Sequence, residues 1–160
     1  AAQNHLGEKV AVMATPLTLH EEKFKQLVKR YENLATIIPV PCPDLVEYVE
    51  KGILEGPELE GYLKDVLTPC LQEGVKAVVL GCTHFPLVKA AIGKVVGESV
   101  RIYDGGEGTA RQAKCLLAAK NLCTDQEKGH ICFESSAPEK EAYYEALYRK
   151  AAHIDSRVKL

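Results

Sequence analysis

KAVVLGCTHFPLVKAAIGKVVGESVRIYD, residues 76–104, is the stretch of sequence that decides the fold class. Residues 76–81 form a short apolar run typical of a buried strand, and residues 85–97 place apolar side chains at helical spacing. Pro86 falls in the first turn of this helix, where its missing N–H costs nothing. Residues 100–104 form a second apolar run. The stretch therefore predicts a strand, a helix and another strand.

The same alternation occurs at the start of the chain. Residues 8–15 predict a strand, and residues 18–34 predict a helix with apolar side chains on one face. Thr18 and Glu21 have the spacing of a capping box, in which a hydroxyl and a carboxylate each bond a free backbone N–H of the first turn. The capping box predicts that the helix begins there.

The remaining segments follow the same rules. We predict further strands at residues 36–40 and 130–135. We predict further helices at residues 44–52, 56–74, 106–122 and 138–152. Pro69 should kink the helix in which it lies or begin a new turn, because proline cannot donate to the helical ladder.

This order of elements predicts the architecture. Strands that alternate with helices pair in parallel and are joined by right-handed crossovers. We therefore expect an α/β fold with an open, mostly parallel sheet and helices on both faces, a flavodoxin-like or Rossmann-like lobe. In such sheets ligands bind at the carboxyl ends of the strands. Cys82, Thr83 and His84 lie at this end of a predicted strand, so they predict a functional site.

Composition and charge narrow the class of protein. The chain has 160 residues, 46% of them hydrophobic, which suffices for one domain or two small lobes with a core. Its 20 basic residues nearly balance 22 acidic ones, so we exclude nucleic acid as a binding partner and expect a small polar partner instead. No apolar stretch is long enough to span a membrane, and the polar first residues do not resemble a signal peptide. We therefore expect a soluble protein of the cytoplasm.

The cysteines have different interpretations. Their spacing is irregular and the apolar content is high, so we expect reduced thiols rather than disulfides. We interpret four of them as small buried apolar side chains: Cys70, Cys115, Cys123 and Cys132. Cys82 differs, because the start of the following helix and the neighbouring His84 would both favour its thiolate.

His84 also has two interpretations. A lone histidine is commonly packed in a core, but an imidazole two residues from a thiol can shuttle protons. A zinc site would need more ligands at compatible spacing, and the sequence has no Cys-x-x-Cys motif and no second histidine nearby. We therefore predict no metal at this position.

Two other segments follow predicted strands and should open on the same edge of the sheet. Residues 41–52 contain Cys42 between two prolines, and also Glu50, whose default interpretation is a solvated helix carboxylate. Residues 104–111 contain paired glycines but lack the lysine and hydroxyl of a phosphate loop. For this second segment we favour a tight turn.

Taken together, these residues resemble the cofactor-independent aspartate/glutamate racemase family, and within it the glutamate racemases. LGCTHFPLV at residues 80–88 is similar to the segment around the family's second catalytic cysteine, where histidine after threonine distinguishes glutamate from aspartate racemases. VAVMATPLT at residues 10–18 is similar to a strand leading to a Gly-Thr-x-x-Thr turn, with Ala14 where glycine is usual. PCPDLVEYVEKG at residues 41–52 and YDGGEGTARQ at residues 103–112 resemble two further family segments.

The resemblance, which covers residues 10–122, implies an activity and roles for its residues. It implies interconversion of L- and D-glutamate without a cofactor, supplying D-glutamate for peptidoglycan and cell wall biogenesis. Two thiols would act on opposite faces of Cα, one of them Cys82. Thr83 would bind the substrate carboxylate beside Cys82 and His84. His84 would also assist proton movement, and Glu50 would orient or tune the histidine.

The sequence departs from the family pattern in one large respect. The family's first-lobe motifs, Gly-Cys-Asn-Thr with the other catalytic cysteine and Asp-Ser-Gly, do not occur here. We therefore expect residues 1–104 to form the second catalytic lobe, and residues 105–160 to form a helix-strand-helix segment that packs on the first lobe. The chain alone would be inactive. A homodimer or domain swap would cover apolar side chains that lack this partner, namely Leu116, Leu117, Tyr144 and Leu147.

Two alternatives stay open at this point. One is a non-catalytic ligand-binding or interaction module that retains the fold, and the other is a racemase of aspartate or another amino acid. The intact Cys82, Thr83 and His84 favour an enzyme, whereas the missing first-lobe motifs favour the module.

Overall fold

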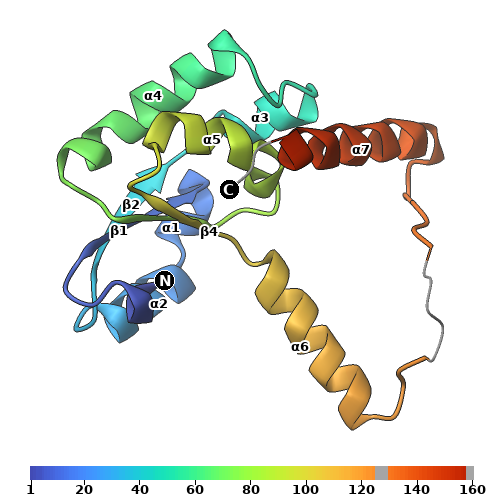
Figure 1. Ribbon diagram of the computed structural model, residues 1–160, viewed down its shortest axis with the longest axis horizontal. Coiled ribbons are helices and arrows are strands. Elements are labelled where there is room, and N and C mark those ends of the chain that lie inside the picture. Colours follow the sequence, from blue (N-terminus) through green and yellow to red (C-terminus); the bar gives the residue numbers. More distant parts are fainter. Residues whose placement is uncertain (125–129, 158–160) are drawn as a thin grey trace. The chain divides into compact units, whose positions relative to one another are not determined.

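The computed structural model describes residues 1–124 and 130–157, and its contacts define two units (Figure 1). One unit is Ala1–Asp104 together with Ala151–Leu160, and the other is Gly105–Lys150. Among the described residues, none of the helices combines the length and the apolar character that a membrane span requires. The first unit contains the sheet.

The described residues of the first unit form a sheet of four parallel strands in the order β2-β1-β3-β4. The strands are β1 (Lys9–Ala14), β2 (Thr36–Pro41), β3 (Ala77–Leu80) and β4 (Arg101–Tyr103). Val10 of β1 pairs with Ile37 of β2 on one side and with Ala77 of β3 on the other. The predicted open, parallel α/β sheet is confirmed.

Strand β1 lies at the centre of the core because both of its faces are covered. Ala11 and Met13 are fully buried on one face, and Val10 on the opposite face is 2% exposed. Strands buried on both faces carry near-continuous apolar runs instead of alternating patterns, which explains the sequence of β1. At the edge of the sheet, β2 buries Val40 alone.

Helices cover both faces of the sheet, as predicted (Figure 1). They are α1 (Pro16–His20), α2 (Glu22–Tyr31), α3 (Leu45–Glu50), α4 (Pro57–Gln72) and α5 (Lys89–Val96). The connection through α1 and α2 runs from β1 to β2, whereas the connections through α3, α4 and α5 run across the sheet in the opposite direction. Right-handed crossovers therefore place the two groups of helices on opposite faces.

Helix α4 packs through one apolar stripe, beside α5. Its buried side chains Leu59, Leu63 and Leu67 recur every four residues, which keeps them on one face of the helix. Pro69 lies inside this helix, which continues to Gln72, so the predicted new turn does not occur. The stripe supplies much of the core on this side of the sheet.

The α2 side of the sheet is less completely filled. A cavity of about 390 Å³ lies between α2, the strands and the first residues of the chain. Phe24, Leu27 and Tyr31 line it from the helix, and Val12 and Val79 line it from the sheet. Its walls are therefore mainly apolar.

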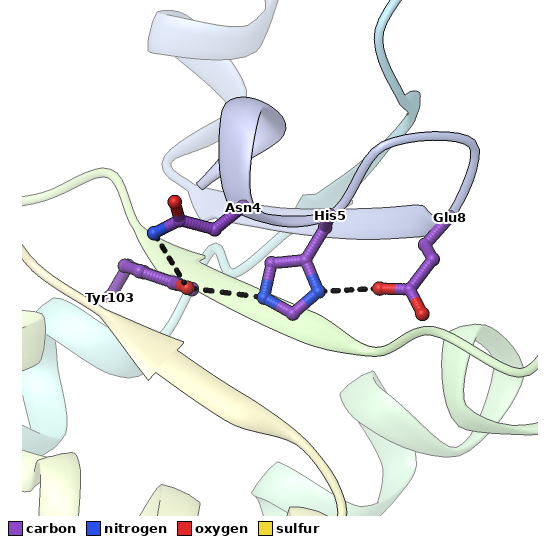
Figure 2. A network of polar contacts seen from close by, with 4 residues as sticks. All are labelled: Asn4, His5, Glu8 and Tyr103. Carbon is purple, nitrogen blue, oxygen red and sulfur yellow. Dashed lines mark hydrogen bonds and ion pairs between the residues drawn. The ribbon is translucent and has the colours of Figure 1, made fainter.

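A polar network ties the segment before β1 to the edge strand β4 (Figure 2). The His5 imidazole lies between the Glu8 carboxylate, 2.6 Å from Nδ1, and the Tyr103 hydroxyl, 3.1 Å from Nε2. An ionised carboxylate only accepts, so Nδ1–H donates to Glu8 and Nε2 accepts from Tyr103. Asn4 Nδ2 donates to the same hydroxyl at 3.4 Å. The network anchors the start of this unit.

The capping box predicted at Thr18 and Glu21 is wrong. Thr15 is the N-cap of α1, and its Oγ1 accepts the N–H of Thr18. Pro16 takes the first helical position, for which its fixed φ is suited, so the helix begins two residues earlier than predicted. The backbone is extended at Glu21 (φ −67°, ψ 142°), and α2 therefore begins as a separate helix.

Two other predicted elements differ from the structure. The helix predicted at residues 85–97 begins as a 3-10 turn, Phe85–Val88, and is α-helical only over Lys89–Val96. Residues 130–135 do not form the predicted strand. A strand needs a neighbour to satisfy its backbone groups, and the described residues of the second unit contain no strand with which these residues could pair.

The second unit contains α6 (Gly106–Ala119), a 3-10 turn (Pro138–Lys140) and most of α7 (Glu141–Arg157). Helix α6 buries none of its residues, and Leu116 and Leu117 are 52% and 45% exposed. Tyr144 is half-buried and Leu147 is buried. The expected exposed apolar face is therefore present on α6, whereas the expectation was wrong for Leu147.

All six cysteines lie within the described residues and are free thiols. Cys42 and Cys70 are buried, and Cys82 is half-buried. The predicted burial is wrong for three exposed thiols: Cys115, Cys123 and Cys132. The first of these belongs to α6, whose side chains have no core to enter.

We expect the free energy of unfolding to fall with rising pH in the alkaline range. Burial, with smaller contributions from Cys70 and Cys82, raises the pKa of the Cys42 thiol from 9.0 to about 12. Between these values the native state keeps a proton that the unfolded state has lost, so stability decreases as the pH rises. Urea unfolding at several pH values measures the slope.

The variant Cys42→Ala should flatten that slope. Tyr62 will retain part of it, because burial also raises the pKa of its phenol to about 12. Cys115→Ala, at an exposed position, is the matched control and should leave the slope unchanged. An equal slope in Cys42→Ala and the parent chain would contradict the assignment.

Candidate active site

The loop after β3 is held against the end of β1. The Gly81 N–H donates to the Met13 carbonyl at 2.8 Å, which extends the pairing of the two strands by one residue. A β-carbon at Gly81 would lie 2.9 Å from that carbonyl oxygen, so a larger residue would require the backbone to shift. Cys82 therefore leaves the edge of the sheet at a fixed point.

The loop after β2 is held against β1 from the other side. The Cys42 N–H donates to the Ala14 carbonyl at 2.9 Å, and the Cys42 side chain is fully buried. Helix α3 follows, with Leu45 buried near its start, and it ends at Glu50. Glu50 and the loop after β3 therefore approach the end of β1 from opposite sides.

The structure places the side chains of Cys82, His84 and Glu50 in a line of two contacts, with the His84 imidazole in the middle. Cys82 Sγ lies 3.9 Å from Nδ1 of His84, and Nε2 of His84 lies 2.8 Å from Oε1 of Glu50. The side chains of His84 and Glu50 are 31% and 46% exposed, and Cys82 is half-buried. Thr83, the fourth predicted site residue, is exposed between the thiol and the imidazole in sequence. These side chains are thus partly accessible to solvent.

This arrangement indicates which nitrogen of the His84 imidazole carries the hydrogen. An ionised Glu50 can only accept, so Nε2 of His84 carries the hydrogen and Nδ1 presents its lone pair toward Cys82. An imidazole oriented in this way can take the thiol proton, and the carboxylate stabilises the imidazolium that results. The line therefore suits acid–base chemistry performed by a thiol.

Cys42 is also at this edge but has a different character. Burial raises the pKa of the Cys42 thiol to about 12, and its side chain is fully buried, so Cys42 packs in the core and is not accessible at this edge. Among the residues that the structure describes, no group of three or more histidine, cysteine or acidic side chains is arranged to hold a metal ion. The reactive candidate at this edge is therefore Cys82.

Three more polar side chains follow strands of the sheet, although none was predicted as a site residue. Thr15 and Thr18 come after β1, and their hydroxyl oxygens lie 3.0 Å apart. Asp104 comes after β4 and accepts from Lys89 Nζ at 2.9 Å. Their positions after the ends of strands were the signal that could have identified them.

Comparison with known proteins identifies relatives of this chain. The profile of the Asp/Glu/hydantoin racemase family matches residues 1–113. The chain is 41% identical over 141 residues to a glutamate racemase of Clostridium perfringens, covering 88% of this chain and 54% of that protein. It is 47% identical over 119 residues to one of Clostridium kluyveri, covering 74% and 46%. The chain thus spans about half the length of the curated relatives it matches.

A solved structure resembles the fold as well. It is Escherichia coli glutamate racemase in complex with L-glutamate and the activator UDP-MurNAc-ala. The TM-score is 0.72 at 28% sequence identity, over 93% of this chain and 57% of that one.

We expect Gly81→Ala to disrupt the site. The added β-carbon would meet the Met13 carbonyl oxygen at 2.9 Å, so the loop that carries Cys82 must move away from β1. Urea unfolding should show a loss of about 1–3 kcal/mol, the usual cost of overpacking. Iodoacetamide labelling followed by peptide mass spectrometry should show a changed reactivity of Cys82.

Gly61→Ala is the matched control. Nothing lies within 4 Å of a β-carbon at Gly61, which is inside helix α4, so this variant should be as stable as the parent or more stable by up to about 1 kcal/mol. If Gly81→Ala behaves like Gly61→Ala, the close approach to β1 does not hold the loop.

Proposed function

Because this chain belongs to the Asp/Glu/hydantoin racemase family, we propose that it carries one half of the active site of a glutamate racemase. The observation that carries the proposal is the line Cys82–His84–Glu50 at the carboxyl edge of the sheet. The glutamate racemases of two Clostridium species, 41% and 47% identical to this chain, support the choice of substrate. The reaction would interconvert L- and D-glutamate without a cofactor.

The reaction requires two bases. Racemisation removes a weakly acidic Cα proton from one face of the substrate and returns a proton to the opposite face. A thiol suits both steps, because thiolate and thiol are close in free energy near neutral pH. Cys82 would be the base for one enantiomer and, as the thiol, the acid for the other.

The neighbours of Cys82 would have supporting roles. His84 would accept and return the thiol proton through Nδ1, which lies 3.9 Å from the sulfur. Glu50 would hold the imidazole in the required tautomer through the 2.8 Å contact at Nε2. Thr83 would donate from its hydroxyl and backbone N–H to a carboxylate of the substrate.

The second thiol would come from a lobe that this sequence does not contain. The alkaline pKa of buried Cys42 argues against an internal substitute. The roughly twofold length of the relatives supports a second lobe, with residues 1–104 as the lobe that carries Cys82 and residues 105–160 as the segment that packs on the other one. The product, D-glutamate, would serve peptidoglycan synthesis in the cytoplasm.

A chimaera tests this proposal. This chain replaces the matching part of the Clostridium perfringens enzyme, and circular dichroism follows the conversion of each glutamate enantiomer. The chimaera should be active, whereas the isolated chain should not, because one face of Cα lacks a base. Cys82→Ser in the chimaera should lower kcat by about 10²–10⁴-fold, the usual contribution of a general acid–base group.

Cys115→Ser is the control, since Cys115 is a free thiol remote in sequence from the proposed site, and it should retain activity. Turnover by the isolated chain that Cys82→Ser abolishes would contradict the half-site. A folded chimaera in which Cys82→Ser does not change kcat would favour a non-catalytic module.

We also expect the isolated chain to self-associate through α6. Leu116 and Leu117 are 52% and 45% exposed, and burying such a side chain contributes about 1.5–3 kcal/mol. Sedimentation velocity should show a dimer or larger species that Leu116→Gln with Leu117→Gln weakens. Arg111→Gln on the same helix should not weaken it, and a strictly monomeric chain at high concentration would contradict the prediction.

A further inference from the structure

Helix α3 is too short to hold its own position. It spans Leu45–Glu50, six residues, and helices of this length are unstable in isolation. Leu45 and Val49 are fully buried and attach one face of it to the core. Its last residue is Glu50, which contacts His84, so the geometry of the candidate site depends on what fixes this helix.

Tyr62 of α4 contacts α3 and its N-cap at two points. Its hydroxyl oxygen accepts the N–H of Asp44, the N-cap residue of α3, at 3.3 Å. Its ring packs against the ring of Tyr48, in the middle of α3, with centroids 5.3 Å apart and planes inclined by 40°. One side chain therefore restrains both the start and the middle of the helix that ends at Glu50.

The phenol of Tyr62 is neutral, and its oxygen accepts the Asp44 N–H. Burial raises the pKa of its phenol to about 12, so the group stays protonated and neutral at physiological pH. The preceding loop is fixed independently, because the Cys42 N–H is bonded to Ala14 and its side chain is fully buried. Tyr62 thus completes the anchoring of the path from β2 to Glu50.

A small change at the start of α3 becomes a large one at its end. Six residues at a rise of 1.5 Å make the helix about 9 Å long, so a tilt of about 10° moves its last residue by about 1.5 Å. Hydrogen bonds weaken over a smaller range than that. The contact between Glu50 and His84, at 2.8 Å, is therefore sensitive to how α3 is held.

We propose that Tyr62 is a positioning residue for the candidate site, acting through α3 on Glu50 and thereby on His84 and Cys82. This role rests on the proposed function for its catalytic meaning, but its physical effect is on the thiol itself. When Glu50 no longer holds the imidazole, the imidazolium next to Cys82 is less stabilised and the thiolate is less favoured.

The test is the alkylation of Cys82 in the full chain. Iodoacetamide reacts with the thiolate, and peptide mass spectrometry separates Cys82 from the exposed cysteines, which serve as internal references. Tyr62→Phe removes the hydroxyl and keeps the ring. Its rate at neutral pH should fall about fivefold, the equivalent of one hydrogen bond, and the pH midpoint of the reaction should rise.

Matched variants distinguish positioning from general damage. Tyr31→Phe removes a hydroxyl on the α2 side of the sheet and should leave the Cys82 profile unchanged. Glu50→Gln should lower the rate by itself, and adding Tyr62→Phe to it should cause little further change, because both act on the same contact. Tyr48→Leu removes the ring contact and keeps the hydrogen bond between Asp44 and Tyr62. It should shift the pH profile of Cys82 alkylation in the same direction, and it is the deciding variant if Tyr62→Phe does not fold.

The proposal is overturned if folded Tyr62→Phe has the profile of the parent chain, if Glu50→Gln leaves the profile unchanged, or if the effect of Tyr62→Phe persists in full without Glu50. The racemase activity of the chimaera does not enter this measurement. If the chimaera is inactive but Tyr62→Phe still slows the alkylation of Cys82, only the proposed reaction is rejected. If the chimaera is active but Tyr62→Phe does not change the alkylation, only the role of Tyr62 is rejected.

Discussion

Two backbone hydrogen bonds, one on each side of β1, hold the candidate site together. Gly81 donates to Met13 and Cys42 donates to Ala14. Each bond continues a parallel ladder by one residue beyond the strand, so two loops that are far apart in sequence leave the sheet at the same edge, on either side of β1. The thiol of one loop and the carboxylate that follows the other are consequently separated by a single imidazole.

Burial then gives two cysteines at the same edge different chemistry. Cys42 is enclosed in the core, where the cost of burying a charge keeps its thiol neutral. Cys82 is half-buried and lies beside the His84 imidazole, so its thiol is partly accessible and has a proton-exchanging group next to it. The placement of the side chain, and not its type, separates a packing residue from a reactive one.

The proposed racemisation by two thiols is consistent with what this chain leaves exposed. The reaction needs a base on each face of Cα, and a single sheet edge presents its thiol from one direction. Cys82 and Thr83 are accessible at that edge, and α6 buries none of its residues. Both features are consistent with a chain that packs against a second lobe, in agreement with relatives about twice its length.

The sequence by itself determined the fold class and the position of Cys82, Thr83 and His84, because apolar periodicity and strand ends are local properties. It misplaced the first helix start, where Thr15 and Pro16 competed with a capping box at Thr18. Only the tertiary structure decided the pairing of Glu50 with His84 and the contact of Tyr62 with α3. It also decided that residues 130–135 form no strand. These outcomes depend on which elements pack together and in what register, because hydrogen bonds between distant residues form only at distances that packing sets.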